Sequence, residues 1–396
     1  MGYPAAPRFA VPTLFLIIVG ILVLITTRYS TYIKSTIVWI DLNNEPSPPT
    51  RHGVKEVVTN IGSHYHVSPS AASPAGVEGC EYPIVIHVTP DDHCTGALAL
   101  YGSIVRNVLL QLKELQRKVC VHVTYVNKNL TTVEDMYKWP SDPNPFTSVA
   151  DCAALDRTPS LNDVVPVRFQ GLLPMELPKK MKSRPEWIAA LNKIHSWGFD
   201  LYPRILILDA DSMVLTDLHK IFLESPTEST ITGVPDQFHD CHDRARLNGG
   251  MIMLRPSRYF HIVSAELLHD PRQSCISMEN DWSQSEQELL NCMCGYRYTQ
   301  YLPMRPEFRC DIMPVYNSVW PKSYGCSDVH VLPMRSIHFA DATKPWDVKE
   351  DKLDERVDTN FYKCVRDGAR NGDTEALKAC KGVDTEELRI LPNLRD

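Results

Sequence analysis

The stretch Arg204–Leu215, which reads RILILDADSMVL, decides the fold class. Its four successive apolar residues, Ile205–Leu208, predict a strand buried on both faces, as in the parallel sheet of an α/β domain. Asp209 and Asp211 follow where this strand ends, at the edge where open α/β sheets bind ligands. Their i, i+2 spacing puts both carboxylates on one side if the backbone stays extended. The pair therefore predicts a divalent cation, with an Asx-type turn carrying two solvated acids as the alternative.

The composition of the whole chain narrows the class of protein. Its 396 residues suffice for one large domain or two smaller ones. The net charge of −7 gives no electrostatic footprint for nucleic acid, so no nucleic-acid partner is expected. The twelve cysteines are even in number and favour disulfides in an oxidising compartment, with the pairing left open. The sequon Asn129-Leu130-Thr131 is consistent with a glycoprotein.

The apolar run Val11–Thr27 is about long enough to span a bilayer. No Ala-x-Ala site follows it, which favours an uncleaved, single-pass type II signal anchor over a cleaved signal peptide. The Pro-, Ser-, Ala- and Gly-rich segment Asp41–Gly79 predicts a tether. We therefore expect a Golgi or endoplasmic reticulum membrane protein with a luminal catalytic domain. The expected parts are a cytosolic tail at 1–10, the transmembrane anchor at 11–27, a stem at 28–78, the catalytic domain at 79–347 and a charged C-terminal tail at 348–396.

Beyond the tether the pattern alternates between strands and helices. A strand over Tyr82–Thr89, a helix over Ala97–Leu115 and a strand over Val119–Val126 indicate a nucleotide-binding α/β half. Further along the chain we expect helices over Arg184–Trp197, over Asp217–Phe222, from Ser285 onwards and near Thr374–Cys380, and a turn over Leu247–Gly250 that feeds a buried strand.

Two of these elements carry candidate ligand contacts. Arg184 and Lys193 on the expected helix could meet an anionic ligand, with solvated helix charges as the alternative. The paired glycines Gly249-Gly250 let the backbone approach a ligand closely, with a plain tight turn as the alternative.

Two later segments add polar candidates. Glu286 stands in the acidic first turn of a helix, where capping alone would also explain it. His338 and Lys344 share a short loop and offer a nitrogen ligand and a point charge suited to phosphate. A structural histidine is the alternative for His338.

Taken in order, these blocks resemble the glycogenin-like family of retaining glycosyltransferases, which is family eight of that class. The resemblance runs from about Tyr82 to Trp346. The blocks that carry it are Gly96-Ala97-Leu98, Arg184 with Asn192–Trp197, Leu208–Asp211 with Val214-Leu215, Asn248-Gly249-Gly250, Glu286-Gln287 with Leu289–Asn291, Pro314–Asn317, and His338-Phe339 with Lys344-Pro345-Trp346.

The resemblance implies an α/β fold of the GT-A type, a Rossmann-like nucleotide-sugar-binding domain with a mixed, mostly parallel sheet. It also implies a UDP-sugar donor and a Mn²⁺ ion held by Asp209, Asp211 and His338. The residues implied to contact the donor or the metal are Thr89, His93, Arg184, Lys193, Asp209, Ala210, Asp211, Asn248, Gly249, Gln287, His338, Asp341 and Lys344. The catalytic candidates are Glu286, Gln287 and Lys193.

Three positions depart from the pattern of that family. His93 stands where the family usually has Tyr, Glu286 replaces an Asp, and Asp341 replaces a Gly. The second change moves a carboxylate by about one methylene, and the third puts an acid near an anion.

These observations predict a retaining glycosyltransferase of the secretory pathway that moves a hexose from a UDP-sugar to a glycan, glycolipid or glycoprotein acceptor. A divalent cation and a lysine suit that chemistry because the leaving diphosphate develops negative charge. The alternatives are a glycogenin-like initiator that glucosylates itself and an inactive relative that only binds nucleotide sugar. The sequence leaves the sugar, the acceptor and the oligomeric state open.

Overall fold

The computed structural model describes residues 77–88, 93–111, 113–131, 136, 145, 153–155, 158–175, 189–216, 218–236, 246–269, 285–294, 308–312, 317–319, 335–340 and 344–383. The chain divides into two compact units, Met1–Thr59 and Asn60–Asp396, and every described residue belongs to the second.

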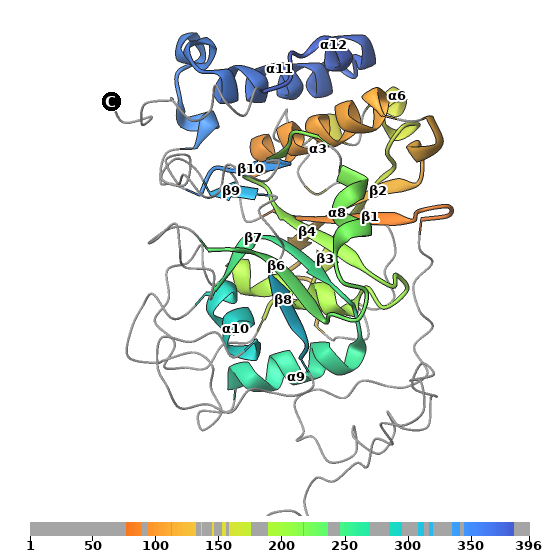
Figure 1. The fold of residues 1–396 in the computed structure, drawn as a ribbon, viewed down its shortest axis with the longest axis vertical. Coiled ribbons are helices and arrows are strands. Elements are labelled where there is room, and N and C mark those ends of the chain that lie inside the picture. The colour runs from red at the N-terminus through yellow and green to blue at the C-terminus, as the bar shows by residue number, and fades with distance from the viewer. Residues whose placement is uncertain are drawn as a thin grey trace, which may run out of the picture. The chain divides into compact units, whose positions relative to one another are not determined.

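A seven-stranded sheet in the order β3-β2-β1-β4-β7-β6-β8 forms the centre of this unit (Figure 1). Its strands are β1 Tyr82–His87, β2 Val119–Val126, β3 Val167–Leu172, β4 Ile205–Asp209, β6 Ile231–Pro235, β7 Leu247–Leu254 and β8 Cys310–Ile312. Strands β3, β2, β1 and β4 run parallel, β7 is antiparallel to both β4 and β6, and β8 is parallel to β6. The sheet is mixed and mostly parallel, so the expected α/β class is confirmed.

A second, three-stranded sheet lies beyond the end of β4. Strand β10, Ser336–His338, pairs antiparallel with β5, Ser212–Val214, and parallel with β9, Asn317–Val319. The register sets His338 opposite Ser212. This pairing brings a histidine from late in the chain beside the two aspartates that follow β4.

Helices cover both faces of the large sheet. The described helices of the unit are α3 His93–Leu110, α6 Pro159–Asn162, α8 Leu218–Glu224, α9 Arg258–His269, α10 Glu286–Met293, α11 Val357–Asn371 and α12 Thr374–Ala379, with 3₁₀ segments η1 Lys113–Leu115, η2 Asn192–Gly198, η6 Pro345–Asp347 and η7 Glu350–Glu355. Helix α3 is buried along most of its length because it lies between the sheet and α11 (Figure 1). A helix enclosed in this way is expected to be apolar on most of its circumference.

The C-terminal helices belong to the same hydrophobic core as the sheet. Phe361, Tyr362, Val365 and Ala369 of α11 pack in one cluster with the residues of β1 and α3. A Cβ atom at Gly102 of α3 would collide with the backbone oxygen of Val365, so the two helix backbones touch there. The helix expected near Thr374–Cys380 is confirmed as α12.

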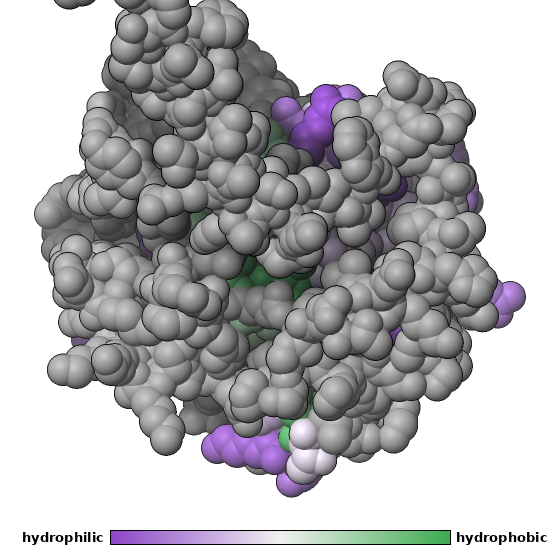
Figure 2. Space-filling model, turned by 90° about the horizontal axis from the view of Figure 1, so that it is seen from below, coloured by the Kyte–Doolittle hydropathy of each residue, from purple (hydrophilic) through white to green (hydrophobic). Residues whose placement is uncertain are grey.

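One face of the unit is hollowed at its centre. Figure 2 shows hydrophobic residues within this central recess. Three disulfides join described cysteines, namely Cys80–Cys120, Cys294–Cys310 and Cys364–Cys380. The expectation of disulfides is therefore confirmed.

Several expected boundaries shift. Strands β1 and β2 lie where they were predicted, whereas α3 begins at His93, four residues before the predicted start. The predicted turn over Leu247–Gly250 is wrong, because β7 is a continuous strand from Leu247 to Leu254. In the helix expected over Arg184–Trp197, the described part is mostly 3₁₀, over Asn192–Gly198.

The expected single-pass localisation in a Golgi or endoplasmic reticulum membrane needs correction. A helix that spans a bilayer needs about 20 predominantly apolar residues. None of the helices in the described ranges is long and apolar enough to do so. The run Val11–Thr27, where the anchor was predicted, lies outside the described residues. The structure therefore gives the membrane prediction no support, and we withdraw it.

Candidate functional site

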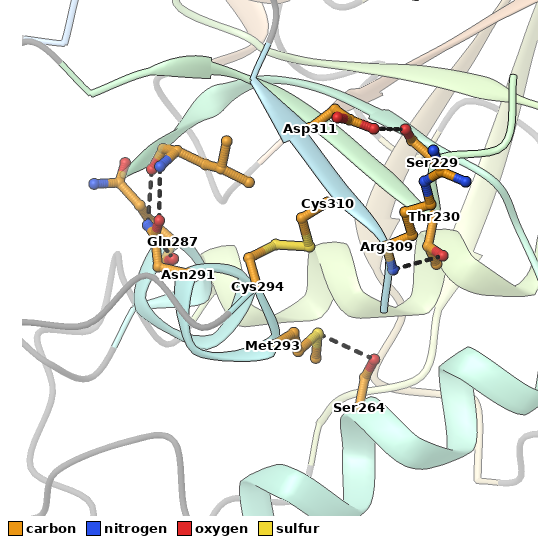
Figure 3. The surroundings of a disulfide bond; sticks show 11 residues. Ser229, Thr230, Ser264, Gln287, Asn291, Met293, Cys294, Arg309, Cys310 and Asp311 are labelled. Carbon is orange, nitrogen blue, oxygen red and sulfur yellow. Dashed lines mark hydrogen bonds between the residues drawn. A yellow bond between two sulfur atoms is a disulfide. The ribbon is translucent and has the colours of Figure 1, made fainter. Parts of the chain in front are cut away.

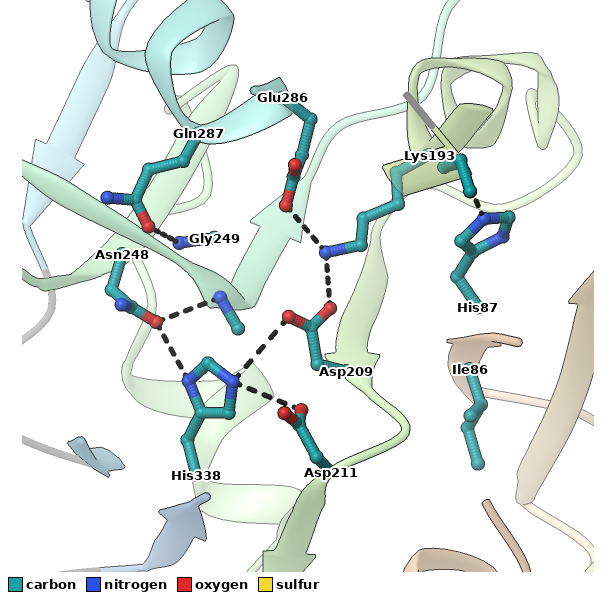
Figure 4. Close-up of polar contacts among 12 residues, drawn as sticks. Ile86, His87, Lys193, Asp209, Asp211, Asn248, Gly249, Glu286, Gln287 and His338 are labelled. Carbon is teal, nitrogen blue, oxygen red and sulfur yellow. Dashed lines mark hydrogen bonds and ion pairs between the residues drawn. The ribbon is translucent and has the colours of Figure 1, made fainter. Parts of the chain in front are cut away.

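Asp209, Asp211 and His338 form the centre of the candidate site. Asp209 ends β4, Asp211 lies in the turn before β5, and His338 ends β10. His338 Nε2 lies 3.1 Å from Asp211 Oδ1 and 3.6 Å from Asp209 Oδ2 (Figure 4). One ligand atom from each residue lies within 4.8 Å of the others. The backbone turns at Ala210–Asp211 instead of staying extended, yet both carboxylates reach the same histidine.

The hydrogen bonds of Asn248 fix the tautomer of His338. Asn248 Oδ1 accepts the backbone N–H of Gly250 at 2.9 Å, which identifies this atom as the oxygen of the amide. The same oxygen lies 3.1 Å from His338 Nδ1, so Nδ1 must carry the hydrogen and donate it. A neutral His338 therefore presents the lone pair of Nε2 to two carboxylates. That arrangement repels unless the ring is protonated or a cation lies among the three groups.

Electrostatics in this cluster favour a further positive charge. Burial raises the pKa of the Asp209 carboxyl, Lys193 opposes that shift, and the neighbouring Asp211 adds to it. Burial would also raise the pKa of Asp211, but His338 and Lys344 outweigh it and hold the value well below its usual range. The groups around Asp211 therefore favour its charged form, whereas burial and the neighbouring acid disfavour the charged form of Asp209, which a further cation beside it would stabilise.

Lys193 bridges two acids from different elements. Its ammonium contacts Asp209 Oδ1 and donates to Glu286 Oε1 at 2.7 Å (Figure 4). Burial alone would lower the pKa of Lys193, but these two carboxylates raise it above its usual value. The preceding Asn192 holds the segment in place, because its side chain accepts from the Met175 N–H and donates to the Ala189 carbonyl. Lys193 is thus a buried, charged bridge between β4 and α10.

Helix α10 is fastened to β7 by side-chain amides. Asn291 accepts from the backbone N–H of Leu247 at 2.6 Å and donates to its carbonyl at 2.8 Å (Figure 3). One turn earlier, Gln287 Oε1 accepts from Gly249 N–H at 2.8 Å. The disulfide Cys294–Cys310 ties the other end of the helix to β8. These contacts place α10 beside the first residues of β7.

Lys344, which follows β10 in the chain, lies at the edge of the site beside Asp211. Its ammonium donates to Asp211 Oδ2 and to the Phe339 carbonyl, both at 2.6 Å. Two residues later, Trp346 packs edge to face with His93 at 5.7 Å and against Tyr362 at 6.4 Å between ring centroids. A Cβ atom at Gly96 would overlap the Trp346 ring, so α3 needs a glycine there. The core thereby supports the segment that carries Lys344.

The structure brings most of the predicted site residues together. Those that lie in one connected network are Lys193, Asp209, Asp211, Asn248, Gly249, Glu286, Gln287, His338 and Lys344. His93 lies at the start of α3 against Trp346, and the Ala210 carbonyl faces Gly96. The predicted residues that lie outside the described ranges are Thr89, Arg184 and Asp341.

One residue beside the network was missed at the level of sequence. Asp236 Oδ2 accepts from Gln287 Nε2 at 2.7 Å, so both ends of the Gln287 amide are bonded within the chain. Asp236 is buried and directly follows β6. The signal was present, because an acid that directly follows an apolar strand is the same pattern that singled out Asp209.

Comparison with known protein sequences finds relatives that are named glycogenins. No protein-family model matches the chain. It is 26% identical to human Glycogenin-2 over 290 residues, which cover 71% of this chain and 47% of that protein. It is 24% identical to Glycogenin-1 of Oryctolagus cuniculus over 177 residues, which cover 43% of this chain and 46% of that protein. The chain thus spans about half the length of the curated relatives it matches.

Glycosyltransferases are among the solved structures with a similar fold. The bifunctional glycosyltransferase WbbM aligns over 78% of this chain and 53% of its own, with a TM-score of 0.46 and 13% identity. The galactosyltransferase LgtC, solved with donor and acceptor sugar analogues, aligns over 77% of this chain and 98% of its own, with a TM-score of 0.43 and 14% identity. Both scores lie below 0.5, so we infer the function of this chain from its own geometry and from its sequence relatives.

The order of the sheet agrees with the fold class expected from the sequence, which is α/β of the GT-A type with a mixed, mostly parallel sheet. The sequence relatives support a glycosyltransferase class for the chain.

Proposed function

We propose that this chain is a retaining glycosyltransferase that moves a hexose from a UDP-sugar to a hydroxyl of a glycan, glycolipid or glycoprotein, with Mn²⁺ held by Asp209, Asp211 and His338. The observation that carries the proposal is the fixed tautomer of His338. Its Nδ1–H is committed to Asn248, so Nε2 is the nitrogen that faces the two carboxylates, and in a neutral ring it presents its lone pair to them. A cation bound by Asp209, Asp211 and His338 together is the simplest way to remove the repulsion among these three electron-pair donors.

The residues present fit a divalent transition metal. Two carboxylate oxygens and one imidazole nitrogen form a donor set that suits Mn²⁺, a metal that accepts both kinds of ligand. Asn248 acts in the outer shell, where a hydrogen bond to the far nitrogen orients a metal-bound histidine. When bound, the ion would neutralise the charge that develops on the departing diphosphate.

Lys344 would supply a second positive charge for the diphosphate. Its ammonium lies on Asp211 at 2.6 Å, at the edge of the same cluster. An ammonium binds phosphate oxygens as a point charge, and the place of Lys344 beside Asp211 would put such a charge at the edge of the candidate metal position. We therefore assign Lys344 to the β-phosphate side of the donor.

The residues on the other side of Asp209 would meet the sugar. Lys193, Glu286 and Gln287 project from η2 and the first turn of α10 towards β7 (Figure 4). Carboxylates and amides of this kind recognise hydroxyl groups by accepting and donating hydrogen bonds. Because the Gln287 amide is bonded at both ends, its position is defined before any ligand arrives.

In the transfer itself, the bond between the anomeric carbon and the β-phosphate oxygen breaks, and a bond to the acceptor oxygen forms. The acceptor hydroxyl gives up its proton to the released diphosphate, so the products are the glycoside and UDP. The transition state is oxocarbenium-like, and the positive charges around the diphosphate lower its energy.

The proposal is tested by incubating the purified chain with a panel of UDP-sugars and Mn²⁺ and measuring the UDP released with and without added glycan acceptors. We expect release that depends on the metal, that falls at least a hundredfold in Asp211→Asn, and that is unchanged in the exposed-site control Glu375→Gln. Mass spectrometry of the chain after the reaction detects self-glucosylation, the first alternative. Absence of turnover with every UDP-sugar, despite binding, would favour the inactive relative.

A further inference from the structure

We infer that Gly249 determines the sugar specificity of the donor site, because its missing side chain gives the Glu286 carboxylate its place against β7. This inference rests on the proposed function. It concerns the choice among donor sugars, which no metal ligand of the site would fix.

The space beside Gly249 is filled by Glu286. A Cβ atom built at Gly249 would lie 2.8 Å from Glu286 Oε1, closer than a Cβ atom tolerates. The next nearest atoms belong to Gln287, at 3.4 Å and 3.6 Å, which are ordinary contacts. The Glu286 carboxylate is therefore the one group that would have to move if position 249 carried a side chain.

Glu286 is held from the opposite direction by Lys193, whose ammonium donates to the same Oε1 at 2.7 Å. Lys193 in turn contacts Asp209, so it has little freedom to follow a displaced carboxylate. Oε1 thus lies between a strand backbone and a fixed cation. An ionised carboxylate offers about four acceptor positions, and within the described part of the chain Lys193 is the group that donates to it. The remaining acceptor positions suit the hydroxyl groups of a sugar.

The helix that carries Glu286 is unable to retreat. The bonds from Gln287 to Gly249 and from Asn291 to Leu247 fasten α10 to β7. A methyl group at position 249 would therefore rotate the Glu286 side chain rather than shift the helix. Discrimination between hexoses that differ in one hydroxyl depends on where such a polar group lies, because a displaced acceptor leaves a buried hydroxyl without a partner.

The neighbouring glycine has a different role, as expected for successive positions of a strand that face opposite ways. A Cβ atom at Gly250 would overlap the imidazole of His338. A side chain at 250 would therefore disturb the metal ligands, whereas one at 249 would disturb Glu286. Alanine at 250 and alanine at 249 are therefore matched substitutions. The first tests the metal ligands, and the second tests the proposed sugar contact.

The test compares UDP with UDP-glucose and UDP-galactose in the presence of Mn²⁺, using isothermal titration calorimetry. For Gly249→Ala we expect the affinity for the preferred UDP-hexose to fall at least tenfold and its preference over the other UDP-hexose to be lost, while the affinity for UDP, which lacks the sugar, stays within about threefold. Gly250→Ala should weaken UDP and UDP-hexose alike. Glu286→Asp shortens the acid and should by itself lower UDP-hexose affinity about tenfold.

The double variant Gly249→Ala/Glu286→Asp tests whether position 249 acts through Glu286. The shorter acid avoids the new methyl group, so the combined loss should be smaller than the product of the two single losses. If Gly249→Ala alone fails to fold and the double variant folds, the coupling is equally demonstrated. A multiplicative loss, an equal loss of UDP and UDP-hexose in Gly249→Ala, or failure of both variants to fold would overturn the inference. If wild type binds UDP but gains nothing from any attached hexose, the proposed function fails together with the inference.

Discussion

His338 Nδ1 lies 3.1 Å from Asn248 Oδ1, an oxygen that also accepts the backbone N–H of Gly250. The Gly250 amide identifies the oxygen, the oxygen requires a hydrogen on Nδ1 of the histidine, and Nε2 is therefore the nitrogen that faces Asp209 and Asp211. A backbone amide of β7 thereby determines which atom of His338 faces the candidate metal position.

Replacing Asn248 by alanine should weaken the metal site without removing any ligand. The ring of His338 would lose the bond that fixes its orientation, and outer-shell changes of this kind cost about 10- to 100-fold in metal affinity. The shift of Tm on titration with Mn²⁺ in the presence of UDP measures the effect. Asn129→Ala, at an exposed loop position, serves as the control and should behave as wild type.

Replacing Lys193 by methionine should destabilise the folded chain even without ligand. The change leaves Asp209 and Glu286 buried and facing each other with no cation between them, and breaking a buried ion pair in this way costs about 3–5 kcal/mol of unfolding free energy. Urea unfolding in chelator measures the cost. Lys118→Met removes an exposed pair with Glu81 and should change nothing measurable. A Lys193→Met variant as stable as wild type would show that the bridge contributes little.

Much of the fold was predictable because it depends on local patterns. Strands β1, β2 and β4 are apolar runs of strand length, and the helix expected from Ser285 onwards is α10, which Ser285 caps through a bond from the Glu288 N–H. The i, i+2 acids after β4 marked the candidate metal position correctly as a meeting point of polar groups. Each of these signals lies within a few residues of sequence.

The missed features depend on contacts between distant segments. The glycines at 249 and 250 indicated a turn, but they lie within strand β7. These positions lack side chains because Glu286 and His338 occupy the space that a Cβ atom would need. The position of Asp236 directly after a strand was a local signal, but its bond to Gln287 joins residues 51 positions apart, and no local pattern predicts that partner. The course of the backbone was predictable from such patterns, whereas the partners of the site residues were not.

Acid should destabilise the chain through its buried histidines. Burial lowers the pKa of His87 and of His122 from 6.5 to about 3, and that of His195 to about 4. Below about pH 6.5 these histidines bind protons in the unfolded chain but stay neutral in the folded chain. The free energy of unfolding therefore falls as the pH drops from about 6.5 towards 4. Each histidine contributes roughly 1.4 kcal/mol per pH unit in that window.

Urea unfolding at pH 7, 6, 5 and 4 checks this prediction. His122→Phe keeps an aromatic ring beside Phe199 and Tyr202 and should flatten the slope by about one histidine's share, whatever its effect on stability at pH 7. A slope that is the same in wild type and in His122→Phe would contradict the assignment of His122 as a neutral, buried group.

Tyr362 should link the C-terminal helices to the site. Its ring packs against Phe339, next to His338, and against Trp346, close to Lys344. Tyr362→Ala should cost about 3–5 kcal/mol of unfolding free energy, as for other buried aromatics, and should also weaken UDP binding because the Lys344 segment loses its support. Tyr362→Phe keeps both ring contacts and is the matched control. Full UDP affinity in a folded Tyr362→Ala variant would separate α11 from the site.

The central claim is that Asp209, Asp211 and His338 bind one divalent cation. The most direct measurement is a titration with Mn²⁺ followed by electron paramagnetic resonance, in which free and bound ion give different signals. We predict one bound Mn²⁺ per chain in wild type and in the control His219→Ala, and loss of that site in His338→Ala and in Asp211→Asn. Binding of Mn²⁺ with undiminished affinity in both site variants would contradict the account.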